Sequence, residues 1–268
     1  MNRGRLLIAA GFAVAAAVAV ALLVGGAFGG EEGELLPDLD QAAPGDLSGR
    51  TLGSAAGPRF LLGFDSAAGN VGEGPLIIVG SRGSQEQFEM NVVQQIRSGD
   101  GSTRVRPVRA RLRYVRSADH EHWHMLDFMR YELRDDDGKI VRPDEKTGFC
   151  LGDRYEVGVR LSRAKPTPTY TQECGKGRRD LLRLREGISV GYGDDYDAHL
   201  EGQNFDITGL PAGRYLLVHR VNSGRRLLES DYSNNASSMA FELTWPRGEK
   251  AAPSLQVIRR CPDKATCR

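Results

Sequence analysis

The feature that most constrains the fold is a series of short apolar runs separated by turn residues. Val, Tyr, Phe and Leu recur at alternate positions in FEMNVVQQI, RVRPVRARLRYVR, HMLDFMRYELRD, RYLLVHRVN and MAFELTW, and segments such as DDDGK, GLPAG and SDYSNN break these runs. A period of two is typical of strands, and regular turn signals are typical of sandwiches and barrels. We find no convincing amphipathic helix longer than about ten residues. The sequence therefore predicts an all-β fold, a single β-sandwich-like domain with few or no long helices.

The N-terminus has the pattern of a targeting segment. After MNRGR, the chain runs from Leu6 to Gly30 without a charged residue. Arginines before such a run keep the N-terminus in the cytoplasm, so the rest of the chain is expected to be exported. The small residues around Ala27 and Gly29 fit a cleavage site, but the run is longer than the roughly 18 residues that span a bilayer. Signal peptide and membrane anchor both stay open, and we expect a secreted or anchored extracytoplasmic protein.

Composition divides the remainder of the chain. Residues 31–57 are rich in Gly, Pro, Ala and acids and are expected to form a flexible linker. Residues 58–247 contain the strand-like runs and form the expected domain, and residues 248–268 form a basic tail with a cysteine loop. With 36 basic and 35 acidic residues, net charge indicates no nucleic-acid partner, and we expect membrane contact only through the N-terminal segment.

The four cysteines are expected to form disulfides in an exported protein. Four cysteines allow three pairings, and sequence alone does not select one. We prefer Cys150 with Cys174 and Cys261 with Cys267, because each pair closes a local loop. Their expected role is structural.

Residues 104–116 carry six arginines between apolar residues. They could form a basic docking patch for an anionic surface. The simpler interpretation, which we favour, is a half-buried strand with a solvated arginine face.

The stretch SADHEHWHMLDF contains three of the five histidines in the chain, at strictly alternate positions. These are His120, His122 and His124, and on a strand they would share one face. Imidazole is a common ligand of borderline metals, so the pattern predicts a metal site, with zinc, copper and non-haem iron all open. The cupin pattern, which needs a glutamate three or four residues after H-x-H, does not fit here.

Several ordered segments of this chain together resemble the lysyl oxidase family of copper-dependent amine oxidases. They are the histidine triplet, the K-x-x-F-C-L segment around Cys150, the tyrosine before Q-x-F-D-I-T, and E-S-D-Y-S-N-N. The resemblance extends loosely from about Leu35 to Trp245. Animal members carry about ten cysteines in this domain and this chain has four, so their disulfide framework does not carry over.

The resemblance implies that His120, His122 and His124 bind Cu(2+). It further implies that Lys146 and Tyr196 are cross-linked into lysine tyrosylquinone, with Tyr192 as the competing tyrosine. The implied reaction is oxidative deamination of primary amines, either peptidyl lysine or small amines, to aldehydes. Dioxygen is the oxidant, and hydrogen peroxide and ammonia are released.

The general base and the function class stay open at this level. Asp127, Asp194 and Asp195 are candidate bases, although each is more simply structural or a partner of an imidazole. His199 could be a fourth ligand or a base but is most simply a loop residue, and His219 is most simply a strand residue. The alternative function is a non-enzymatic exported β-sandwich module of the CARDB type with a metal site, and a zinc hydrolase on the same histidines is a third.

Overall fold

The structure is a computed structural model that describes residues 33–53, 55, 57–117, 121–143, 148–200 and 202–267. Nineteen strands and no helix occur among these residues, which confirms the predicted all-β class. The expected N-terminal targeting segment lies outside the described residues. Within the described ranges, no helix is long and apolar enough to cross a membrane.

The largest sheet has seven strands and carries the histidine segment. Its order is β12-β9-β8-β7-β6-β14, and β1 pairs with β7 from outside this path. All of its pairings are antiparallel, as expected for strands joined by short turns. The strands are β1 (Glu34–Leu35), β6 (Leu76–Ser81), β7 (Glu89–Ser98), β8 (Thr103–Arg116), β9 (Glu121–Leu126), β12 (Gly148–Phe149) and β14 (Arg183–Ile188).

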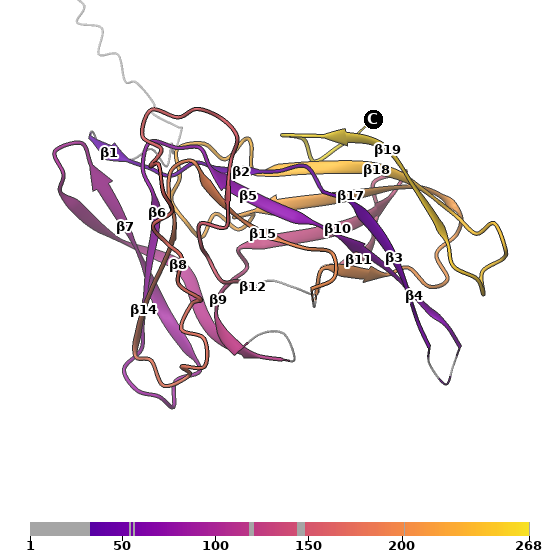
Figure 1. Cartoon of the computed structure of the whole chain (residues 1–268), viewed down its shortest axis with the longest axis horizontal. Helices are drawn as coiled ribbons and strands as arrows, with labels where there is room; N and C mark the ends of the chain where they lie inside the picture. The colour runs from indigo at the N-terminus through magenta and orange to yellow at the C-terminus, as the bar shows by residue number, and fades with distance from the viewer. Residues whose placement is uncertain are drawn as a thin grey trace, which may run out of the picture.

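A second sheet has five strands in the order β11-β10-β17-β18-β19. Figure 1 shows it on the opposite side of the molecule from the seven-stranded sheet. Its strands are β10 (Met129–Asp135), β11 (Ile140–Pro143), β17 (Gly213–Val221), β18 (Ala236–Thr244) and β19 (Ser254–Cys261).

Two smaller sheets complete the fold. The four-stranded sheet, β13-β15-β5-β2, lies between the two larger sheets (Figure 1) and contains Tyr196. The three-stranded sheet has the order β16-β4-β3. The strands are β2 (Leu39–Gln41), β3 (Leu47–Leu52), β4 (Arg59–Phe64), β5 (Ser66–Asn70), β13 (Tyr155–Glu156), β15 (Tyr192–Tyr196) and β16 (Asn204–Asp206).

One large hydrophobic cluster joins all four sheets. On β9, Trp123 and Met125 are fully buried in it. They pair with Tyr114 and Leu112 of β8, so the alternation of side chains directs the residues between them to the other face. The core is therefore what determines which face of the sheet the histidines occupy.

The segment expected to be a flexible linker contributes strands from Glu34 onward. β1, β2 and β3 pair with β7, β5 and β4. Leu39 is fully buried, and the Glu34 carboxylate lies 2.7 Å from the Arg106 guanidinium. Composition favoured a linker because Gly, Pro and acids dominate, but these few apolar and paired residues suffice to pair the segment with strands of three sheets.

The basic C-terminal tail is also more ordered than its composition suggests. Its residues from Ser254 to Cys261 form β19, which pairs with β18. Both predicted disulfides are confirmed: Cys150–Cys174 and Cys261–Cys267. The second bridge holds the end of the chain beside the five-stranded sheet.

The arginine run lies on β8, as the simpler interpretation predicted. Ala110 and Leu112 point into the core and are fully buried. Four of the six arginines form ion pairs, which join Arg104 and Arg106 to Glu34, Arg113 to Glu89, and Arg116 to Glu121. The face is therefore largely charge-balanced, which favours a solvated strand face over a dedicated docking patch.

Glu229 is a buried carboxyl whose titration provides a first test of how the core is packed. Its fully buried carboxylate accepts hydrogen bonds from Asn222 (2.7 Å), Asn235 (2.6 Å) and the Leu39 amide (2.9 Å). Burial nevertheless raises the pKa of Glu229 to about 7. A carboxyl whose pKa is raised on folding stabilises fully below its unfolded pKa, and this stability is lost as pH rises through the folded pKa.

We therefore expect the native chain to lose about 3 kcal/mol of unfolding free energy between pH 4.5 and pH 8 relative to Glu229→Gln. Urea unfolding of both proteins at the two pH values measures this difference. Identical pH dependences would contradict the assignment.

His219 gives a second test, in which the unfolding free energy falls toward low pH instead of toward high pH. It lies on β17, as expected for a strand residue, and its ring packs against Phe64 and Tyr131 at centroid distances of 5.0 and 4.6 Å. Burial lowers the pKa of His219 to about 3. Because protonation is favoured only in the unfolded chain, stability is lost as pH falls below the unfolded value of 6.5.

We expect the loss to reach about 4 kcal/mol near pH 3. His219→Phe should show a shallower acid dependence of its unfolding free energy than the native chain. A parallel acid dependence of the two proteins would show that another group is responsible.

Candidate metal centre

The histidine face of β9 consists of His122 and His124. His124 is buried, with 3% of its surface exposed, and His122 is partly buried. They lie opposite Val115 and Arg113 of β8. Trp123, between them, points into the core, so the sheet orients both imidazoles toward the other side. His120, the third predicted ligand, lies outside the described residues.

The two imidazoles converge on a common point. Their Nε2 atoms are 2.7 Å apart and their ring centroids 4.7 Å apart. Two nitrogen ligands about 2.0 Å from one metal would be about 2.8 Å apart at a right angle and about 3.3 Å apart at a tetrahedral angle. The observed separation therefore fits adjacent right-angle positions, as around Cu(II), better than tetrahedral zinc. Within the described residues, no group of three or more His, Cys, Asp or Glu side chains could hold a metal, so a complete site requires a further ligand.

β12 brings the segment that follows Lys146 against this pair. Gly148 and Phe149 pair with Leu126 and Met125 at the end of β9. A Cβ atom at Gly148 would lie 2.9 Å from the His124 Cβ and 3.2 Å from its Nδ1. Only a residue without a side chain allows this approach, so Gly148 lies directly beside the imidazole. Lys146 itself is outside the described residues.

Tyr196 contacts the same segment from the other side. It ends β15 with 7% of its surface exposed. Its ring meets Phe149 edge to face at a centroid distance of 4.2 Å, and its hydroxyl oxygen accepts a 3.2 Å hydrogen bond from the Cys150 amide. Tyr196 is thus held against the residues three and four positions after Lys146.

Tyr192, the competing tyrosine, is directed elsewhere. Its hydroxyl donates a 3.3 Å hydrogen bond to the Lys165 carbonyl. The structure therefore brings Tyr196, and not Tyr192, against Phe149 and Cys150, which we call the F-C segment.

The environment of Tyr196 keeps its phenol neutral. Burial raises the pKa of Tyr196 well above its ordinary value, and the charge of Asp194 raises it further. The hydrogen bond from Cys150 opposes this rise only partly. Forming a tyrosinate here would therefore need a nearby cation, such as a bound metal ion.

The Cys150–Cys174 disulfide connects the two sides of the site. The Cys150 amide binds Tyr196, and the Cys174 carbonyl accepts a 2.9 Å hydrogen bond from the Trp123 amide. The bridge thus links the tyrosine segment to the middle of the histidine strand.

The candidate bases lie in different environments. Asp127 has a left-handed backbone, with φ of 56°, and forms a 2.5 Å ion pair with Arg226. Asp195 is exposed, as is His199. Asp194 is only 1% exposed, and the Arg154 Nε lies 3.9 Å from its Oδ1. Of the three aspartates, Asp194 is the buried carboxylate on the same face of β15 as Tyr196.

Sequence reasoning missed Glu186 and Arg154. Glu186 lies on β14 and is buried, and Arg154 places its guanidinium 3.5 Å from the Cys150 sulfur. The available signal was that Glu186 alternates with Leu184 and Ile188 in RLREGI, which puts a carboxylate on the apolar side of the strand. Charged residues are almost never fully buried unless they are paired.

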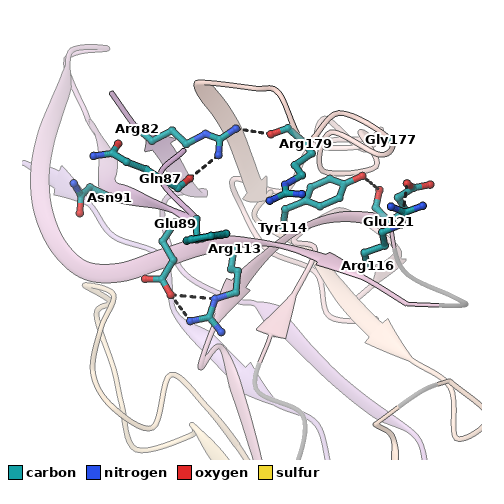
Figure 2. A pocket seen from close by; sticks show the side chains of 11 residues that line it. Arg82, Gln87, Glu89, Asn91, Arg113, Tyr114, Arg116, Glu121, Gly177 and Arg179 are labelled. Carbon is teal, nitrogen blue, oxygen red and sulfur yellow. Dashed lines mark hydrogen bonds and ion pairs between the residues drawn. The ribbon is translucent and has the colours of Figure 1, made fainter. Parts of the chain in front are cut away.

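A pocket of about 860 Å³ adjoins the start of the histidine strand. Figure 2 shows Arg82 and Arg179 on one wall and the Glu89–Arg113 pair on another. The Tyr114 hydroxyl closes one side by donating a 3.0 Å hydrogen bond to the Glu121 carbonyl. The wall carries four arginines and two glutamates, namely Arg82, Arg113, Arg116, Arg179, Glu89 and Glu121, so it suits groups with negative charge better than bare cations.

Comparison with known proteins supports the sequence resemblance. A family model described as lysyl oxidase matches residues 85–247. Lysyl oxidase homolog 2 of Gallus gallus is 32% identical over 138 residues, which cover 51% of this chain and 16% of that protein. Lysyl oxidase homolog 1 of Homo sapiens is 36% identical over 118 residues, which cover 43% of this chain and 18% of that protein. Lysyl oxidase homolog 3 of Homo sapiens is 31% identical over 138 residues, which cover 51% of this chain and 16% of that protein. The matched segment therefore spans less than a fifth of each of these relatives.

The imidazole pair predicts the metal dependence of this site. Removing one ligand should cost more than the roughly 10–100-fold in affinity that losing an outer hydrogen bond to a ligand costs. We therefore expect His122→Ala and His124→Ala each to weaken Cu(II) binding at least about 100-fold. Titration calorimetry measures the affinity, and His199→Ala, at an exposed loop position, is the control. Unchanged affinity in both strand variants would refute the site.

Proposed function

Because this chain belongs to the lysyl oxidase family, we propose that it is a copper- and quinone-dependent amine oxidase. It would convert primary amines, either peptidyl lysine or small amines, to aldehydes with release of hydrogen peroxide and ammonia. The observation that carries the proposal is the packing of Tyr196 against Phe149 and Cys150, which follow Lys146 in sequence. A Lys146–Tyr196 cross-link needs these two segments of the chain close together, and this contact supports that.

The residues present fit the implied groups. His122 and His124 offer two converging nitrogen donors, and His120 is the third proposed ligand. When formed, lysine tyrosylquinone supplies an electrophilic carbonyl that takes two electrons from the amine, and copper promotes its formation. The protein contributes the position of the reacting groups and the path of the proton.

Three features of the chain support this positional role. Phe149 and the Cys150 amide hold the Tyr196 ring and hydroxyl in one orientation. Burial of Tyr196 excludes water from the ring. Asp194, two residues earlier on the same strand face, is the carboxylate that we propose as the proton acceptor. Asp127 is a weaker candidate because Arg226 already pairs with it.

The location and substrate follow from the same proposal. Two disulfides suit an oxidising, extracytoplasmic compartment. The arginines of β8 are mostly ion-paired, so they oppose a cationic amine less than their number suggests. A binding module without activity would need neither the imidazole pair nor the contact between Tyr196 and the F-C segment.

Cofactor formation is the direct test. Copper-loaded protein exposed to oxygen should form a coloured adduct with phenylhydrazine, and its digest should contain a peptide that joins Lys146 to Tyr196. Mass spectrometry that finds both residues unmodified would exclude the quinone mechanism. A zinc hydrolase or a binding module would give neither signal.

Substitutions test which tyrosine and which lysine the reaction needs. Lys146→Arg and Tyr196→Phe should retain copper but lose peroxide production from a simple amine. Tyr192→Phe and Lys176→Arg are matched controls and should stay active, since Tyr192 contacts Lys165 and Lys176 pairs with the exposed Glu173. Activity in Lys146→Arg would contradict the cofactor assignment.

A further inference from the structure

Glu186 is a buried carboxyl that the proposed chemistry does not use. It lies in the middle of β14 with 2% of its surface exposed. Burying a carboxyl without full hydrogen bonding is costly. Its Oε1 atom has no hydrogen-bond partner anywhere in the described part of the chain. Such a group at this depth indicates a specific role.

The other carboxyl oxygen binds the segment that holds Tyr196. Glu186 Oε2 accepts a 3.3 Å hydrogen bond from the Leu151 amide. The preceding amide, that of Cys150, donates to the Tyr196 hydroxyl. Glu186 and Tyr196 therefore accept from adjacent amides, four and five residues after Lys146.

Electrostatics favour the neutral form of this carboxyl. Burial raises the pKa of Glu186 well above its ordinary range, and the charge of Asp194 adds to the rise, while the Leu151 amide and Arg154 oppose it. A protonated carboxyl resembles a carboxamide in shape and can still accept through its carbonyl oxygen. Its contribution should therefore depend on the acceptor atom and not on a negative charge.

We propose that Glu186 is a positioning residue for the Lys146–Tyr196 pair. By accepting a hydrogen bond from the Leu151 amide, it holds residues 149–151 in place, so that the Cys150 amide can donate to the Tyr196 hydroxyl. The purpose of this role depends on the proposed function, but the hydrogen bonds can be measured without it. The side chain acts through the backbone of residues 150 and 151 and touches no reacting atom.

The first test uses the metal-free protein and amide hydrogen exchange measured by NMR. In Glu186→Leu, the Cys150 and Leu151 amides should exchange at least about tenfold faster, as expected for the loss of one hydrogen bond. Glu186→Gln keeps the acceptor and should restore slow exchange. Glu229→Leu is the matched control, because it also removes a buried carboxyl that accepts a backbone amide, that of Leu39, yet it should leave Cys150 and Leu151 unchanged.

The second test measures the fraction of Lys146–Tyr196 peptide after exposure to copper and oxygen. Glu186→Leu should lower this fraction at least about tenfold, whereas Glu186→Gln should retain it. If the native chain forms no cross-link, the proposed function fails, and amide exchange alone decides the role of Glu186. Native-like exchange at Cys150 in Glu186→Leu would overturn the proposal. Equal defects in the Leu and Gln variants would overturn it too, because they would make the charge and not the acceptor responsible.

Discussion

The hydrogen bond from the Cys150 amide to the Tyr196 hydroxyl is the contact on which the candidate site depends. It joins two sheets: Tyr196 ends β15 of the four-stranded sheet, and Cys150 follows β12 of the seven-stranded sheet. Because β12 pairs with the end of β9, this single contact relates the tyrosine to the histidine strand. The Cys150–Cys174 disulfide reinforces the same connection, as does the hydrogen bond from the Trp123 amide to the Cys174 carbonyl.

Buried polar groups surround this contact, and they have an energetic cost. Glu186 and Asp194 are both almost fully buried near Tyr196, with Arg154 on one side. Replacing such groups by apolar residues of similar size is often neutral or stabilising in proteins. Their presence here is therefore better explained by the position and proton state of Tyr196 than by stability of the fold. The hydrophobic cluster that joins the four sheets carries the stability.

The departures from sequence expectation share one physical cause. Residues 34–52 and 254–261 have the composition of a linker and a tail, yet both form strands. A strand added to a sheet edge needs little apolar surface of its own, because the neighbouring strand supplies half of the hydrogen bonds. Composition reports the average over a segment, whereas Leu39 and Glu34 act individually through the core and through Arg106.

The sequence by itself determined the strand class and the shared face of His122 and His124, since these follow from local spacing. It favoured the two local disulfides, and the structure selected them among the three possible pairings. The sequence also identified the family through short ordered motifs. Only the tertiary structure decided that Tyr196 and not Tyr192 contacts the F-C segment. It also decided that Asp127 forms an ion pair with Arg226 and that Glu186 accepts a hydrogen bond from the Leu151 amide. These contacts join residues 27 to 99 positions apart, and local periodicity carries no information about which strands from different sheets will lie together.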